Sequence, residues 1–187
     1  MTDSRTGYNA VAIGLHWLIF VLIMANWSLG IYMVDLPISP HMLKSFSWHK
    51  WVGVTIFLIA ILRVAWRISH PPPPLPATVP HWQRTAANLT HLMLYLLLFF
   101  IPVSGWLYSS ATGIPTVYLG WLQLPDLVQK DEHLADLLKI AHISLNSALF
   151  GIVCIHVASA LKHHFIDRDE ILARMLPFLN SAGKRHR

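Results

Sequence analysis

Two histidines fourteen residues apart, His142 and His156, lie within one apolar stretch near the end of the chain. Fourteen residues of α-helix rise about 21 Å and turn through about 1400°, so both imidazoles point in nearly the same direction. Ionisable side chains are rare inside membrane helices and usually serve a function. Two on one face, separated by most of a hydrocarbon layer of about 30 Å, indicate two stacked cofactor levels.

Two further histidines match these depths. His16 lies about five residues into the first apolar stretch, and His156 lies about five residues before the end of the fourth. His49 opens the second stretch as His142 opens the fourth, so these two share the opposite boundary. Antiparallel helices of a bundle can direct such pairs at one cofactor between them. An iron porphyrin takes two axial ligands, so the four histidines predict two non-covalent haems that transfer electrons.

Three other residues lie near the level of His16 and His156. His91 opens the third apolar stretch on the side of His16. It is either the alternative partner of His156 or a hydrogen-bond donor to a haem propionate, and we favour His16 as the ligand because His91 lies closer to the boundary. Arg63 and Arg67, one helical turn apart, are expected either to neutralise propionates or to mark the membrane edge.

The composition leaves little of the chain outside a membrane. Of 187 residues, 55% are hydrophobic and only 12% are charged, about half the charged fraction of a soluble domain. We therefore expect an all-α membrane protein, a bundle of four transmembrane helices in a single membrane domain of residues 1–187. The expected spans are about residues 11–33, 48–68, 89–109 and 140–161, joined by a proline-rich linker at 69–88 and a loop at 110–139.

Charge predicts the orientation of these spans. Ten basic residues would share one side with both termini and the linker, whereas Lys44, Lys50, Lys130 and Lys139 would lie on the other. The positive-inside rule then predicts that both termini are cytoplasmic. The basic isoelectric point reflects this topology, and no nucleic-acid partner is expected. The single cysteine, Cys154, excludes a disulfide framework and haem attachment through C-x-x-C-H.

A cluster of Lys162, His163 and His164 follows His156. His163 is seven residues beyond His156 and lies within about 20° of the same helix face. Quinone reduction needs a proton donor, and histidine titrates near neutral pH. The cluster is expected either to bind quinone through His163 and Lys162 or to anchor the helix end at the membrane boundary.

These residues stand in strings that resemble the bacterial cytochrome b561 family, over about Tyr8 to Leu176. The strings are GLHWL, HKWVG, RVAWRISHPPPPLP, HLMLYLLLF and ALKHHFIDRDEILARM. The resemblance implies two b-type haems with His16, His49, His142 and His156 as axial ligands, and ubiquinone near His163. Members of this family also look like the cytochrome subunits that anchor formate dehydrogenases and hydrogenases, and some are superoxide oxidases that pass electrons to ubiquinone. The resemblance further implies a location in the bacterial inner membrane.

The expected function is therefore membrane oxidoreduction, in which electrons pass between an external donor and the quinone pool. The donor is a small molecule such as superoxide, steered by the external lysines, or a redox partner protein. One alternative is a haem-bearing anchor subunit of a dehydrogenase or hydrogenase. Another is a histidine-lined metal or proton transporter. The latter predicts acidic residues at membrane depth, and none of the nine Asp and Glu residues falls within an expected span.

Overall fold

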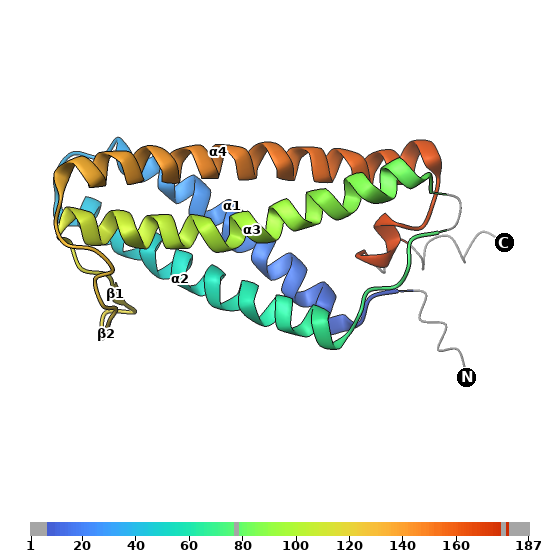
Figure 1. Ribbon diagram of the computed structural model, residues 1–187, viewed down its shortest axis with the longest axis horizontal. Helices are drawn as coiled ribbons and strands as arrows, with labels where there is room; N and C mark the ends of the chain where they lie inside the picture. Colours follow the sequence, from blue (N-terminus) through green and yellow to red (C-terminus); the bar gives the residue numbers. More distant parts are fainter. Residues whose placement is uncertain (1–6, 77–78, 177–178, 180–187) are drawn as a thin grey trace.

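The computed structural model describes residues 7–76, 79–176 and 179, and four long helices dominate it (Figure 1). Each is long and apolar enough to cross a membrane, which confirms the predicted four-helix, all-α architecture. The helices are α1 (Ala10–Val34), α2 (Pro40–Ser69), α3 (His81–Thr112) and α4 (Glu132–Lys162). A short hairpin of β1 (Val117–Tyr118) and β2 (Leu122–Gln123) precedes α4, and two turns, η1 (His163–Asp167) and η2 (Leu172–Arg174), follow it.

The helices run antiparallel and have two distinct ends (Figure 1). Helices α3 and α4 lie side by side, and α1 crosses obliquely behind α3 while packing on α2. At the "linker end" α1 begins, α2 ends, α3 begins and α4 ends. At the "hairpin end" the two short strands project beyond α2. The η2 turn lies at the linker end, so the chain starts α1 and finishes its described course on the same side of the bundle.

Three helices begin earlier than the expected spans do. Helix α2 begins at Pro40, α3 at His81 and α4 at Glu132, so the linker and the loop are shorter than the predicted 69–88 and 110–139. Hydropathy detects only the part of a helix that suits hydrocarbon, and polar first turns escape it. Side-chain caps mark two true starts: Ser39 Oγ accepts from the Met42 amide at 3.2 Å, and Asp131 Oδ1 from Leu134 at 3.0 Å.

Apolar packing joins the helices halfway along the bundle. Ile19 of α1, Ile56 and Ala60 of α2, and Leu98 of α3 form one buried cluster. On the α4 side, the Trp27 ring of α1 stacks on Phe150 with ring centres 4.6 Å apart and planes 5° apart. The layer between the two ends is therefore held by apolar contacts from all four helices.

The hairpin is attached to the flank of α2. Trp51 Nε1 donates to the Val117 carbonyl at 2.6 Å, and the hydroxyls of Thr55 and Tyr118 lie 3.0 Å apart. The side chain of Trp121 near the hairpin tip is 75% exposed. The loop after α3 therefore projects sideways from α2 (Figure 1), where bilayer headgroups would meet it, and does not cover the end of the bundle.

Gly113 ends α3 in a conformation that suits glycine. Its φ is 74°, and an added Cβ would lie 3.1 Å from Cδ of Lys130. We expect Gly113→Ala to lower the stability of the solubilised protein by about 1 kcal/mol, because an L-residue resists this backbone region. Gly151→Ala in α4 is the control, since a Cβ there meets nothing within 4 Å and alanine favours helix. Equal melting temperatures in thermal circular dichroism would contradict this.

Candidate functional site: two histidine levels in the bundle

The first histidine level lies toward the hairpin end and joins α2 to α4. The rings of His49 and His142 face each other with centres 6.2 Å apart and planes 82° apart. His49 lies nine residues after Pro40 and His142 ten residues after Glu132, so neither opens its helix as the sequence had suggested. Both α2 and α4 begin before their expected spans, and by a similar number of residues. The two histidines therefore still share one depth, as predicted.

A neighbouring helix holds each of these rings in the same way. His49 Nδ1 lies 3.2 Å from the Asn26 carbonyl of α1, and a Cβ on Gly30 would lie 3.2 Å from the ring. His142 Nδ1 lies 3.1 Å from the Ile101 carbonyl of α3, and a Cβ on Gly105 would lie 3.0 Å from its ring. In each case a carbonyl at one position and a glycine four residues later fix the imidazole.

These contacts decide which ring nitrogen is available. A carbonyl oxygen only accepts, so Nδ1 of both His49 and His142 must carry the proton and donate it. The Ser104 hydroxyl, 3.0 Å from His142 Nδ1, adds a second contact on that side. The Nε2 atoms then keep their lone pairs, which is the usual state of a histidine that binds a metal.

The second level lies toward the linker end and brings three histidines together. His16 of α1 faces His156 of α4 with ring centres 6.2 Å apart, and His91 of α3 faces the same ring at 5.4 Å. His16 lies six residues after Ala10 and His156 six residues before Lys162. The predicted depth match is therefore present, and the predicted competitor His91 lies in the same cluster.

Two arginines of α2 accompany this cluster. The guanidinium groups of Arg63 and Arg67 lie 5.9 and 5.8 Å from the ring centre of Tyr95, and Arg63 Nε donates to its hydroxyl at 3.3 Å. Arg63 is also close enough to act electrostatically on His16, His91 and His156. The linker-end level thus combines three imidazole side chains with fixed positive charge, which suits a cofactor that carries carboxylates.

The spacing of the rings fits one metal ion between each pair. Two metal–nitrogen bonds of about 2 Å, with each nitrogen about 1 Å from its ring centre, place the ring centres about 6 Å apart. The His49–His142 and His16–His156 pairs both have 6.2 Å. The His91–His156 separation of 5.4 Å is too short for the same arrangement. The residues present therefore fit an iron with two axial imidazoles at each level.

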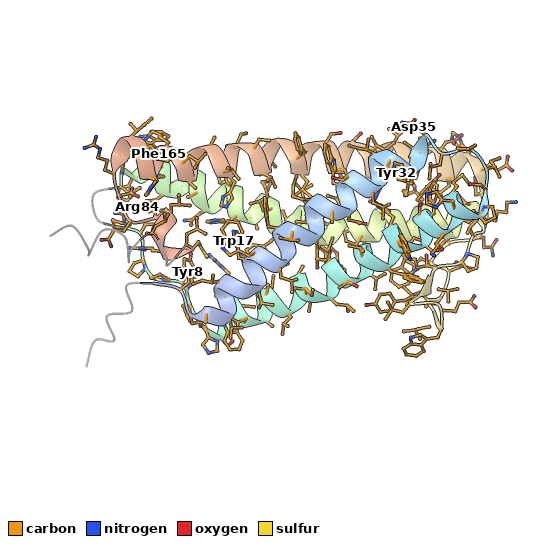
Figure 2. The ribbon with its side chains drawn as sticks, turned by 180° about the vertical axis from the view of Figure 1, so that it is seen from behind. Tyr8, Trp17, Tyr32, Asp35, Arg84 and Phe165 are labelled. Carbon is orange, nitrogen blue, oxygen red and sulfur yellow. The ribbon has the colours of Figure 1, made fainter. Side chains whose placement is uncertain are left out.

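The predicted quinone residues form a polar cluster just beyond α4. His163 Nδ1 pairs with Asp169 Oδ2 at 2.6 Å, and Lys162 Nζ pairs with Asp167 Oδ2 at 2.6 Å. The His163 side chain is only 13% exposed, whereas His164 packs edge-on against the exposed ring of Phe165 (Figure 2). His163 is thus held inward by a carboxylate that the sequence analysis had not linked to it.

Sequence reasoning missed the residues that aim the histidines. The carbonyls of Asn26 and Ile101 are backbone groups, so no side-chain pattern marks them. Ser104 is a polar side chain inside an expected span, which is the one signal that could have found it. Gly30 and Gly105 gave no signal, because glycine is common in membrane helices and its partner is set by helix packing. Tyr95 was missed for the same reason, since its contact with Arg63 exists only once α2 packs on α3.

Comparison with known proteins gives a consistent result. A family model described as prokaryotic cytochrome b561 matches residues 7–178. Cytochrome b561 homolog 2 of Escherichia coli K12 is 37% identical over 94% of this chain and 94% of its own length. The "Probable superoxide oxidase CybB" of Yersinia pestis is 27% identical over 91% of this chain and 96% of its length. Cytochrome b561 homolog 1 of E. coli K12 is 28% identical over 91% and 97%.

The glycine beside His142 provides a test of this site. We expect Gly105→Ala to weaken haem binding at the hairpin-end level about 10- to 100-fold, the scale of outer-shell changes at metal sites. The new methyl would lie 3.0 Å from the His142 ring, which two hydrogen bonds hold in place. The matched control is Gly53→Ala, whose Cβ would lie 3.8 Å from Asn26. Haem bound per polypeptide is the measurement, and equal values for both variants would contradict the role of Gly105.

Proposed function

The chain belongs to the prokaryotic cytochrome b561 family of membrane electron-transfer proteins with b-type haem, and we propose that it holds two haem b groups, one at each histidine level. His49 and His142 are the axial ligands toward the hairpin end, and His16 and His156 those toward the linker end. The observation that carries this assignment is the common ring separation of 6.2 Å at both levels.

His91 takes a supporting role in this proposal. Its ring lies too close to His156 to share an iron with it, but it belongs to the same cluster of rings. Together with Arg63 and Arg67 it provides donors for the propionates of the linker-end haem. The sequence left two roles open for His91, axial ligand and propionate donor. Mutation distinguishes them, because replacing a propionate donor does not remove an axial ligand.

The protein residues limit what the bound cofactors can do. Haem b supplies a one-electron carrier at each level. Each haem would be held by an imidazole on either side, which would leave no position for oxygen to bind. An apolar layer around Ile56, Leu98 and the Trp27–Phe150 stack separates the two levels. The arrangement therefore suits electron transfer along the bundle and not oxygen activation.

We place the linker end in the cytoplasm and the protein in the bacterial inner membrane. The support is the asymmetry of basic residues, because the linker-end segments carry most of the arginines. Quinone is then reduced at the cytoplasmic side, where it takes up two electrons and two protons. His163 donates a proton there, and the carboxylate of Asp169 at 2.6 Å orients its ring for the transfer. Lys162, which pairs with Asp167, provides a positive charge beside His163 at the end of α4.

The donor acts at the hairpin end, and superoxide is the small molecule that we propose. Each superoxide gives up one electron and leaves as dioxygen, so two are consumed for each quinone reduced. A relative carries the name superoxide oxidase, which supports this choice. The four lysines predicted to steer the anion lie at this end. Lys50 Nζ donates to Ser109 Oγ at 2.6 Å and Lys44 lies over the Trp48 ring, and because both partners are uncharged, neither contact cancels the positive charge.

The axial assignment has a direct test. In His16→Ala and in His156→Ala, haem bound per polypeptide should fall by about half, because each level has its own pair of ligands. His91→Ala is the matched control and should retain both haems. Haem is counted by extraction, and the reduced-minus-oxidised absorption spectrum identifies the haem that remains. Loss of a haem in His91→Ala together with retention of both in His16→Ala would give the ligand role to His91.

The quinone assignment is tested at the neighbouring pair His163 and His164. His163→Ala should keep both haems reducible, while their reoxidation by a soluble quinone analogue slows by about 10²-fold or more, the scale of a lost general acid. His164→Ala, one residue away, should reoxidise at the parental rate. Stopped-flow absorption after anaerobic reduction gives both rates. If His163→Ala reoxidises as fast as the parent, quinone binds elsewhere and the cluster is a membrane anchor.

A further inference from the structure

The chain folds back on itself after η1. Arg168 adopts a left-handed conformation with φ 55°, and the Asp169 amide donates to the His163 carbonyl at 3.1 Å. This reversal directs residues 169–176 away from the end of α4 and under the linker end, where η2 lies between α4 and the proline-rich linker (Figure 1). We call residues 169–176 the fold-back segment.

The fold-back segment contacts the linker-end histidine level. Trp17 Nε1 donates to the Met175 carbonyl at 2.9 Å, and the Trp17 ring packs edge-on against His16 with centres 5.3 Å apart. Ala173 is only 6% exposed, so the segment is packed against the bundle. Figure 2 places Trp17 at the linker end. The segment is thus joined to the helix that carries His16 by a side chain next to that histidine.

Arg174 lies in this segment with one nitrogen unused. Its Nη1 donates to the Pro74 carbonyl at 2.7 Å, but its Nε is buried and has no hydrogen-bond partner among the described residues. Of the three carboxylates nearest in sequence, Asp167 and Asp169 pair with Lys162 and His163. The third, Glu170, is exposed and forms no ion pair with Arg174 among the described residues. A buried donor without an acceptor costs about 1–3 kcal/mol, and more when the group is charged. An anionic acceptor would remove this cost.

We propose that Arg174 binds a propionate carboxylate of the linker-end haem, which makes the fold-back segment part of the cofactor pocket. This inference rests on the proposed binding of a haem by His16 and His156. The guanidinium is the side chain best suited to a buried carboxylate, because its planar donors match the two oxygens. Its positive charge offsets the carboxylate and so favours the reduced iron, which carries one positive charge fewer.

Arg84 provides a matched comparison at the same end of the bundle. Its Nε donates to the Val79 carbonyl and its Nη2 to the Pro76 carbonyl, both at 2.9 Å. Both arginines therefore contact the proline-rich linker through backbone carbonyls, but the Nε of Arg84 is satisfied and that of Arg174 is not. A purely structural role predicts similar consequences when either is replaced, whereas a role toward the haem belongs to Arg174 alone.

The experiment is a redox titration of Arg174→Gln, Arg174→Lys and Arg84→Gln as full-length proteins. In Arg174→Gln the reduced-to-oxidised ratio of the linker-end haem at a fixed potential should fall about tenfold, the effect of a unit charge at about 10 Å in an effective dielectric of about 20. The hairpin-end haem should not change. Arg174→Lys should restore most of the ratio, and Arg84→Gln should match the parent.

Reconstitution with iron protoporphyrin dimethyl ester, whose propionates are blocked, identifies the partner. Arg174→Gln should bind ordinary haem about tenfold more weakly than the parent, because a hydrogen bond between charged groups is lost, whereas both proteins should bind the ester with equal affinity. A difference that persists with the ester would overturn the proposal and indicate another anion, such as a lipid phosphate.

In the redox titration, parental behaviour of Arg174→Gln, or equal shifts in Arg174→Gln and Arg84→Gln, would also overturn the proposal. If Arg174→Gln loses the haem, retention by Arg174→Lys supports the proposal and loss by both contradicts it. A parent with fewer than two haems would instead refute the proposed function.

Discussion

The arrangement depends on one constraint: an imidazole inside hydrocarbon must be aimed by the protein alone, because no water is present to satisfy its second nitrogen. At the hairpin end a carbonyl and a glycine four residues apart do this twice. Asn26 and Gly30 of α1 hold His49 of α2, and the same spacing in Ile101 and Gly105 of α3 holds His142 of α4. Each glycine lets the ring approach the backbone, so the packing of α1 on α2 and of α3 on α4 is set by the histidines as much as by apolar contacts.

The linker end meets the same constraint differently. Among the described residues, no hydrogen bond fixes the rings of His16, His91 or His156; they pack against one another and against Trp17. Positive charge from Arg63 lies close to all three. A fixed positive charge near a low-dielectric layer is tolerated only with a partner. The hairpin-end level is therefore defined by protein contacts alone, whereas the linker-end level needs an anionic group to complete it.

The sequence predicted the depths of the histidines well, because the position of a residue along a helix follows directly from its number. His142 and His156 lie on one helix, and their antiparallel partners are at the matching depths. Helix ends were predicted less well, since the polar turns from Pro40, His81 and Glu132 carry no hydropathy signal. The glycine contacts and the fold-back segment were not predictable, because they depend on which helices are neighbours and on a chain reversal at Arg168 that has no glycine to mark it.

The two ends differ in what their chemistry demands. Removing an electron from a small anion requires access but no proton. Quinone reduction requires protons, and the linker end has His163 paired with Asp169 at 2.6 Å. Asp169 begins the same segment that carries Arg174 and reaches Trp17 beside His16. Residues 163–175 therefore run from the proposed proton donor to the contact with Trp17 beside His16, so the groups proposed to handle the proton and the electron lie at the same end of the bundle.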